Sequence, residues 1–274
     1  MSRRGTVLLT GVGRRRSIGA GLALGLADDG WDLVLNYWVP YDERLAYERG
    51  EHDTDEIAAE CRHRGSKVEV VPADLAVIET PTLLVEAASA LGNLRGLVMS
   101  HCESVDSTVL DTTIESWELH FAVNARAAWL LIKAFAEHLQ VAPDTEVAPD
   151  TEVAPPTEVA PPTAVAGRII ALTSDHSAHN LPYGASKGAL DRIVVAAAVE
   201  LADRGIRANV INPGPIDTGW MSPQIRQAGI AQTPAGRLGT PADTANLVRF
   251  LMSDAGGWIN GQVLYSNGGF TTSS

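Results

Sequence analysis

Three side chains in the second half of the sequence have the types and spacing of a proton-transfer site. Tyr183 and Lys187 stand four residues apart in a predicted helix, so both lie on one face of it. A phenol has a pKa of about 10 in water, and a nearby ammonium group increases its acidity by stabilising the phenolate. Ser174 ends a predicted strand and can hydrogen-bond the same substrate oxygen. Together they predict protonation of a carbonyl oxygen while a nicotinamide supplies hydride.

A second candidate site is a glycine-rich turn near the start of the chain. Residues 10–21 contain four glycines, among them Gly11 and Gly19, between an apolar run and a helical stretch. Glycine lets backbone amides approach a phosphate, and a helix N-terminus adds a favourable partial charge. The position of the turn after the first predicted strand favours a dinucleotide site over an ordinary turn. Asp74, after the third predicted strand, can accept from an adenine amino group or cap a helix, and the two roles are compatible.

The end of the second predicted strand indicates which dinucleotide binds. An NAD site places an acidic residue there for the ribose diol, whereas a 2′-phosphate requires cations. The strand ends in Asn-Tyr-Trp at 36–38, and no acidic residue follows until Asp42. Arg14, Arg15 and Arg16 lie within the glycine-rich turn, where guanidinium groups can bind a phosphate. The pattern favours NADP(H) over NAD(H).

The elements that must position these residues alternate along the chain. Apolar runs without polar alternation predict strands buried on both faces, and helical stretches separate them, so the pattern is typical of a parallel sheet covered by helices. We therefore expect a doubly wound α/β protein, a Rossmann fold, in a single domain over 1–274. Predicted strands cover 6–10, 31–38, 68–72, 96–100, 168–174, 208–212 and 263–265, and helical regions cover 18–29, 53–64, 87–91, 114–140, 183–204 and 240–253.

One segment, 141–166, departs from this alternation. It repeats a six-residue Ala-Pro-rich unit and holds six of the fifteen prolines and five carboxylates, without Lys or Arg. Proline removes amide donors and favours extended neighbours, so neither a helix nor a central strand is available. We expect a disordered insert with polyproline character, and weigh against it a hexapeptide β-helix and a partner-docking segment. Its place between a helix and the following strand predicts that it lies on the rim opposite the catalytic groups.

Composition and charge limit the class of protein further. Lys and Arg total 21 against 33 Asp and Glu, a net charge of −12, which argues against nucleic acid or an anionic membrane as the main partner. The sequence has no apolar run of about 18 residues. The two cysteines cannot form a disulfide framework, and adjacent His101 and Cys102 lack further metal ligands. We expect a cytoplasmic protein with a small-molecule substrate and no bound metal.

The combined motifs resemble the short-chain dehydrogenase/reductase superfamily from Thr6 to Phe270, excepting the insert. They are Thr10-Gly11 through Gly19, Ala73-Asp74-Leu75, Asn124, Ser174, Tyr183-Gly-Ala-Ser-Lys187, Asn212-Pro-Gly-Pro-Ile-Asp-Thr218 and the 261–269 segment Gly-Gln-Val-Leu-Tyr-Ser-Asn-Gly-Gly.

The resemblance implies a role for each matching residue. Tyr183 is the proton donor or acceptor, Ser174 holds the substrate oxygen, Lys187 binds the nicotinamide ribose and lowers the pKa of Tyr183, and Asn124 keeps a water in the proton relay. Residues 218–221 begin a mobile loop over the substrate. A homotetramer or homodimer is implied as well. The cofactor-binding set is Gly11, Arg14, Arg15, Arg16, Ser17, Ile18, Gly19, Asp74, Leu75, Tyr183, Lys187, Pro213, Gly214, Ile216 and Thr218.

The sequence departs from the family pattern in three places. Five residues separate Gly11 from Ser17, so the turn is longer than usual. The segment 99–102, Met-Ser-His-Cys, replaces the usual Asn-Asn-Ala-Gly. Ser174 stands nine positions before Tyr183, closer than usual, which leaves Ser177 as a fallback. The short loop between Ser174 and Tyr183 contains His176 and His179, which border the predicted substrate pocket.

These patterns predict an NADP(H)-dependent oxidoreductase that interconverts a carbonyl and a secondary alcohol. The chain resembles 3-oxoacyl carrier-protein reductases, so a 3-oxoacyl thioester is one candidate substrate beside small ketones, sugars and polyketide intermediates. Enoyl reduction is disfavoured, because that branch usually has a longer Tyr-to-Lys spacing. The alternative is a sensor or scaffold that binds NADP(H) without turnover, motivated by the altered turn and the altered 99–102 segment. The stretch 39–52 has no predicted role.

Overall fold

A seven-stranded parallel sheet forms the centre of the protein. The computed structural model describes residues 4–139 and 165–270. Within them the strand order is β3-β2-β1-β4-β5-β6-β7, and each neighbouring pair is parallel. The direction of winding reverses between β1 and β4, so the predicted doubly wound Rossmann fold is confirmed. The strands are β1 Thr6–Thr10, β2 Asp32–Tyr37, β3 Val68–Pro72, β4 Leu94–Met99, β5 Gly167–Leu172, β6 Ile206–Asn212 and β7 Val263–Tyr265.

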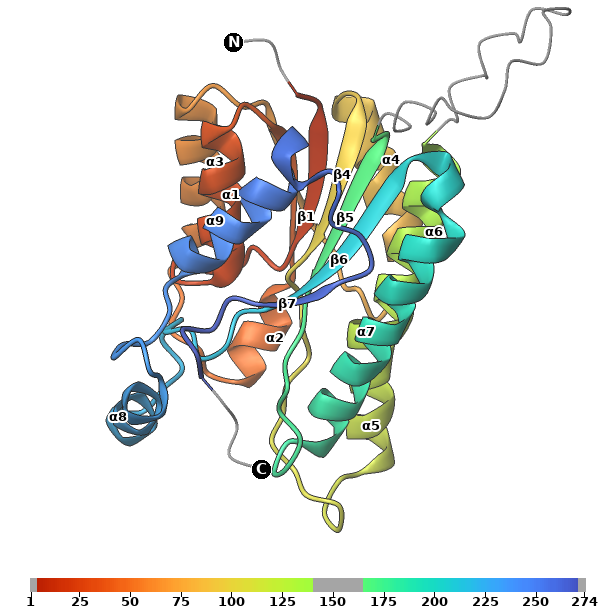
Figure 1. The fold of residues 1–274 in the computed structure, drawn as a ribbon. Coiled ribbons are helices and arrows are strands. Elements are labelled where there is room, and N and C mark those ends of the chain that lie inside the picture. The colour runs from red at the N-terminus through yellow and green to blue at the C-terminus, as the bar shows by residue number, and fades with distance from the viewer. Residues whose placement is uncertain (1–3, 140–164, 271–274) are drawn as a thin grey trace, which may run out of the picture.

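Helices cover both faces of the sheet (Figure 1). One face packs against α1, α3 and α9, and the other against α4, α6 and α7, so the sheet separates two apolar cores. The helices are α1 Ile18–Asp28, α2 Val39–Arg44, α3 Asp53–His63, α4 Thr80–Leu91, α5 Ile114–Phe121, α6 Ala127–His138, α7 Leu181–Glu200, α8 Pro223–Gln232 and α9 Pro241–Leu251. Among the described residues, no helix is long and apolar enough to cross a membrane.

The first strand and helix show how local sequence builds the nucleotide end. Every residue of β1 is buried, because its Thr, Val and Leu side chains are covered on both faces. Ser17 caps α1 by accepting a hydrogen bond from the Ala20 amide at 3.0 Å, which satisfies one of the free amides at the helix start. Leu22 and Leu26, one turn apart, are fully buried and fix α1 against the sheet.

The structure adds two helices to the predicted elements and divides a third. The stretch without a predicted role contains α2, and the loop expected over the substrate contains α8. The predicted helical region 114–140 is α5, a π-helical turn over Ala122–Arg126, and α6. A π turn widens the helix locally and is frequent at functional sites, and this one contains Asn124.

The proline-rich insert falls largely outside the described residues, so its predicted disorder is not addressed by the structure. Its two flanks are described. The α6 helix ends at His138, and the Ala166 amide donates to the Gly205 carbonyl at 2.8 Å, just before β5 begins. Both flanks lie at the amino ends of the strands, opposite α2, α5 and α8 (Figure 1). The place of the insert itself, on the rim opposite the catalytic groups, stays a prediction.

Candidate functional site

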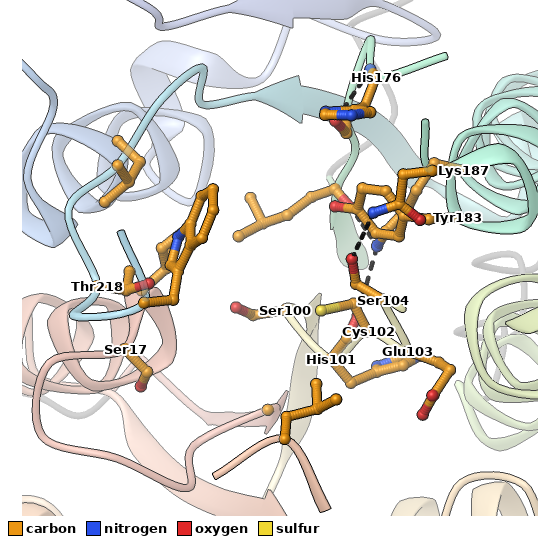
Figure 2. Close-up of a pocket in the computed structure, with 18 of the residues that line it drawn as sticks. Ser17, Ser100, His101, Cys102, Glu103, Ser104, His176, Tyr183, Lys187 and Thr218 are labelled. Carbon is orange, nitrogen blue, oxygen red and sulfur yellow. Dashed lines mark hydrogen bonds between the residues drawn. The ribbon is translucent and has the colours of Figure 1, made fainter. Parts of the chain in front are cut away.

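A cavity of about 1170 Å³ opens at the carboxyl ends of the strands. The glycine-rich turn, the segments after β3, β4, β5 and β6, and the helices α2 and α8 line it. In Figure 2, Tyr183 and Lys187 face Ser17 and Thr218 across this cavity. The nucleotide end and the chemical end of the sequence therefore meet in one site.

Most of the predicted cofactor-binding residues line the cavity, and three predicted residues do not. Arg15 and Arg16 are exposed outside it, and Asn124 is fully buried without lining it. The predicted residues on the wall are Gly11, Arg14, Ser17, Ile18, Gly19, Asp74, Leu75, Ser174, Tyr183, Lys187, Pro213, Gly214, Ile216 and Thr218.

The glycine-rich turn has no room for side chains at its two key positions. Gly11 has a φ of +79°, and a Cβ there would lie 2.6 Å from the Ser100 carbonyl carbon. A Cβ at Gly19 would lie 2.3 Å from the carbonyl oxygen of Gly11. The turn therefore runs close against the end of β4 and the start of α1, and its amides lie at a helix N-terminus that favours a phosphate.

Each of the three arginines in the turn has a carboxylate partner. Arg14 pairs with Asp42 at 3.1 Å, and its guanidinium lies 4.5 Å from the centroid of the Tyr47 ring. Arg15 pairs with Glu56 at 2.8 Å, and Arg16 pairs with Asp217 at 3.3 Å. Arg14 is the member of the three that lines the cavity.

Asp42 lies at the nucleotide end although it follows β2 by several residues. The α2 helix turns the chain back, so that the Asp42 carboxylate packs against Gly13 and Arg14. Burial raises the pKa of Asp42, and the Arg14 guanidinium lowers it. Asp42 and the other α2 residues at the cavity belong to no known sequence motif, so the sequence did not predict that they line the site. Pro40, in the first turn of α2, is the one residue that could have indicated a helix here.

Asp74 lines the cavity, and its expected contact with an adenine amino group stays a prediction. Its Oδ1 accepts from the Ala76 amide at 2.8 Å in the turn before α4, whereas the residue that precedes the first turn of α4 is Glu79. The Asn36 amide donates to the Val71 and Ala73 carbonyls at 3.2 and 3.0 Å. These bonds fix the segment that leads to Asp74 and Leu75.

The structure brings Ser174, Tyr183 and Lys187 together as predicted. Lys187 is 3% exposed, and its Nζ lies 5.9 Å from the centroid of the Tyr183 ring. The ammonium donates to the Leu172 carbonyl at 2.9 Å and to the His101 carbonyl at 3.4 Å. Ser174 Oγ accepts from the His176 amide at 3.1 Å, and Ser177 also lines the cavity.

Burial dominates the acidity of both titrating groups. It raises the pKa of Tyr183, and the hydrogen bond with Ser174 lowers it. The expectation that Lys187 lowers the pKa of Tyr183 does not describe the net effect, because burial outweighs the favourable contacts. Burial also lowers the pKa of Lys187. A phenol is protonated at neutral pH even at its ordinary pKa of about 10, so Tyr183 holds a proton that a substrate oxygen can accept.

Asn124 joins the segment after β4 to α7. Its Oδ1 accepts from the Glu103 amide at 2.8 Å, and its Nδ2 donates to the Glu103 carbonyl at 2.8 Å and to Ser186 Oγ at 2.9 Å. Ser186 in turn donates to the Tyr183 carbonyl at 2.9 Å. The side-chain amide thereby positions the first turn of α7, and its predicted part in a water relay stays a prediction.

His101 acts as a neutral hydrogen-bonding bridge between β1, β4 and the π-helical turn. Its Nε2 lies 3.1 Å from the Val123 carbonyl, which can only accept, so Nε2 carries the proton. Nδ1 then accepts from the Thr10 hydroxyl at 2.6 Å. Burial lowers the pKa of His101 to about 3.

The sulfur of Cys102 points into the cavity (Figure 2), and burial raises the pKa of this thiol. Within 4–139 and 165–270, no group of three or more His, Cys, Asp or Glu residues could hold a metal ion.

The remaining wall comes from the segment after β6 and from the loop after β5. Gly214 has a φ of +64°, and a Cβ there would lie 2.4 Å from Cβ of Asn267. Trp220, Met221 and Ile225 add apolar surface on the α8 side. Both loop histidines, His176 and His179, line the cavity.

The fold and the site together define an NAD(P)-dependent oxidoreductase. Residues 11–145 and 154–271 match the family model described as Enoyl-(Acyl carrier protein) reductase. The chain belongs to the short-chain dehydrogenase/reductase superfamily.

Relatives and solved structures share nearly the whole chain. It is 31% identical to the NADPH-dependent aldehyde reductase-like protein, chloroplastic, of Arabidopsis thaliana, over 94% of this chain and 92% of that protein. It is 26% identical to tetrahydroxynaphthalene reductase of Pyricularia oryzae, over 96% of this chain and 88% of that protein. The structure of a blue fluorescent protein from a metagenomic library in complex with NADPH superposes with a TM-score of 0.78 and 25% identity, covering 98% of this chain and 99% of that one.

Proposed function

We propose that the protein is an NADP(H)-dependent oxidoreductase that interconverts a carbonyl compound and a secondary alcohol. The observation that supports this most is the meeting of Tyr183, Ser174 and Lys187 on the wall of the cavity that the glycine-rich turn also lines. A phenol placed beside a hydroxyl and an ammonium group can exchange a proton with a substrate oxygen.

The residues of the cavity fit a nicotinamide dinucleotide. Gly11 and Gly19 allow the turn to pack against Ser100 and against its own backbone, and both line the cavity at the start of α1, where a pyrophosphate is expected. Pro213, Gly214, Ile216 and Thr218, in the segment after β6, also line the cavity and would hold the nicotinamide end. When bound, the nicotinamide supplies or accepts the hydride.

The side chains of this protein handle the substrate oxygen and its proton. The Ser174 hydroxyl holds the oxygen, and the Tyr183 hydroxyl gives it a proton during reduction or accepts one during oxidation. The Lys187 ammonium donates to two backbone carbonyls and lines the cavity, so its remaining hydrogen would bind the ribose. Asn124 holds the Tyr183 turn in place and would support a water relay.

Two observations support NADP(H) as the preferred cofactor. The relative from Arabidopsis thaliana is named as NADPH-dependent, and the metagenomic neighbour was solved with NADPH. In this chain, Arg14 is the cation at the end of the cavity where a 2′-phosphate would lie.

The cavity wall favours a ketone with an apolar portion. Trp220, Met221 and Ile225 provide the apolar surface, and His176 and His179 provide polar contacts at its edge. A 3-oxoacyl thioester combines a carbonyl with an acyl chain and is the first candidate.

A sensor that binds the cofactor without turnover is the alternative that the altered 99–102 segment suggests. We further propose that the chain is one domain and assembles as a homotetramer or homodimer, which exposed Trp129 on α6 and Val199 on α7 support.

Cofactor binding and turnover can be tested together. Thermal stabilisation by NADPH and by NADH is measured for wild type and Tyr183→Phe, and nicotinamide absorbance is followed with ketones and 3-oxoacyl thioesters. We expect stronger stabilisation by NADPH in both proteins and turnover by wild type, reduced about a thousandfold in Tyr183→Phe. Tyr265→Phe, on the exposed edge strand, is the matched control. Stabilisation without turnover on any substrate would favour the sensor.

A further inference from the structure

The α2 helix crosses the groove in which a dinucleotide should lie. In a doubly wound sheet the cofactor binds where the winding reverses, which is between β1 and β4 here. One bank of this groove is the glycine-rich turn after β1, and the other bank is the segment after β4. Figure 1 shows α2 at the carboxyl edge of the sheet. Five of the residues 41–47 line the cavity, namely Tyr41, Asp42, Arg44, Leu45 and Tyr47. We call residues 41–47 the clasp.

The clasp is attached to the first bank through Arg14. The Asp42 carboxylate pairs with this guanidinium at 3.1 Å, and both side chains are largely buried. The Tyr47 ring lies against the same guanidinium, 4.5 Å from its central carbon. Gly13 leaves the room that this contact needs, because a Cβ there would lie 2.8 Å from Asp42 Oδ2. Arg14 also donates to the Thr218 carbonyl at 3.3 Å, so it connects the clasp to the segment after β6.

The clasp is attached to the second bank through Glu103. Arg44 donates to both carboxylate oxygens of Glu103, at 2.5 and 2.6 Å. Glu103 is 4% exposed, and its backbone is held at both its amide and its carbonyl by the side chain of Asn124. The partner of Arg44 is therefore a fixed, buried carboxylate, whereas Arg44 itself is half-exposed on the outer side.

An aromatic pair connects the two attachments. The rings of Tyr41 and Tyr47 meet edge to face with their centroids 5.9 Å apart, and both line the cavity. The floor of the groove remains open beneath them, since Gly11, Ser17, Gly19 and Asp74 all line the same 1170 Å³ cavity. The clasp thus covers the groove without filling it.

We propose that the clasp closes over the bound dinucleotide and determines how fast it is released. This inference rests on the proposed function, because it requires a cofactor in the groove. Release requires the clasp to lift, and lifting requires Arg44 to leave Glu103. A buried carboxylate that loses its partner is costly to leave unpaired, so the pair keeps the clasp closed. Arg44 and Glu103 are on this view positioning residues for the cofactor.

The test is the dissociation rate of NADPH, followed by its fluorescence after rapid mixing with excess NADP⁺. We expect Arg44→Gln and Glu103→Gln each to accelerate release about tenfold, because removing one partner of a buried pair acts mainly on dissociation. The double variant should release no faster than the faster single variant, since one pair is lost in all three. Arg64→Gln, which removes two surface ion pairs, with Asp28 of α1 and Glu60 of α3, should release NADPH at the wild-type rate.

Hydrogen exchange of the clasp amides supplies an independent readout and covers the case in which Glu103→Gln does not fold. NADPH should slow exchange across residues 41–47 in wild type, and less so in Arg44→Gln. Faster exchange with NADPH would show that the segment is displaced by the cofactor and would overturn the proposal. Unchanged release rates in folded variants would overturn it as well. Failure of wild type to bind either dinucleotide would overturn the proposed function together with the clasp.

Discussion

Acidification should destabilise this protein through His101, because the folded state holds that imidazole neutral. The ring is buried between Thr10 and the Val123 carbonyl, which together use both of its nitrogens. Burial is the main cause that lowers its pKa from 6.5 to about 3, and the nearby Lys187 ammonium adds to it. Between pH 6.5 and about 3, the His101 imidazole binds a proton in the unfolded chain but not in the folded chain.

The sign and size of the effect follow from linkage between protonation and folding. The folded-state pKa of His101 lies below its unfolded value, so the stability it contributes is complete above pH 6.5 and is lost as the pH falls toward 3. Within this window the free energy of unfolding falls by about 1.4 kcal/mol per pH unit for one excluded proton. Between pH 7.5 and 4.5 the loss due to His101 is therefore about 2.5 kcal/mol.

Urea unfolding of wild type and His101→Gln at pH 7.5, 6.0 and 4.5 isolates this contribution from that of the carboxylates. Glutamine retains an amide donor and an acceptor but does not titrate. We expect the variant to be the less stable protein at pH 7.5, with the difference shrinking by about 2.5 kcal/mol at pH 4.5. His63→Gln, at an exposed position of α3, serves as the control. A difference that stays constant with pH would refute the description of His101 as a buried neutral bridge.

Three further changes test other parts of the site. Gly19→Ala should weaken NADPH binding by at least about tenfold in a fluorescence titration, since the methyl group would lie 2.3 Å from the Gly11 carbonyl oxygen; Gly188→Ala, where nothing lies within 4 Å, is the control. Lys187→Met should lower kcat/KM by about a hundredfold, with a wild-type Tm showing that the fold survives. Deleting residues 142–165 should leave turnover near wild type, and a loss above about tenfold with folding intact would contradict their predicted place on the opposite rim.

The elements that the sequence predicts best are those determined by neighbours along the chain. The strand before Ser174 and the helix that carries Tyr183 and Lys187 are defined by local apolar pattern, and they place the three groups together because both meet at one edge of a parallel sheet. The glycine-rich turn is local in the same sense. Its position between β1 and α1 is enough to predict its closeness to the catalytic groups.

The clasp could not be predicted, because contacts with distant residues determine where it lies. The α2 helix is six residues long, shorter than a sequence pattern can define with certainty. Its place over the groove depends on Arg14 and on Glu103, which is 59 residues from Arg44. Neither pairing has a spacing that a periodic pattern would reveal, so the stretch 39–52 has no signal apart from Pro40.

The 99–102 segment shows how a departure from a family pattern is compensated by contacts that the pattern does not contain. In the sequence, Met-Ser-His-Cys replaces the residues that usually form the cofactor-binding wall after the fourth strand, so the pattern alone does not predict that wall. In the structure, His101 supplies the hydrogen bonds to Thr10 and Val123, and its carbonyl accepts from Lys187. The segment is therefore tied to β1, to the π-helical turn and to the catalytic lysine, and the departure gives no structural reason to favour a protein without turnover.

The three guanidinium groups that the sequence presents are not equivalent in the structure. Arg15 and Arg16 are paired with carboxylates outside the cavity, so their charges are largely compensated before any ligand arrives. Arg14 is also paired, but it alone of the three lines the cavity. Its Nε pairs with Asp42 and its Nη1 donates to the Thr218 carbonyl, so a 2′-phosphate would have to bind through Nη2 while the Asp42 pair and the clasp stay closed. Arg14→Gln should therefore weaken NADPH binding more than NADH binding in a fluorescence titration, and equal losses for the two dinucleotides would contradict a role for Arg14 in cofactor preference.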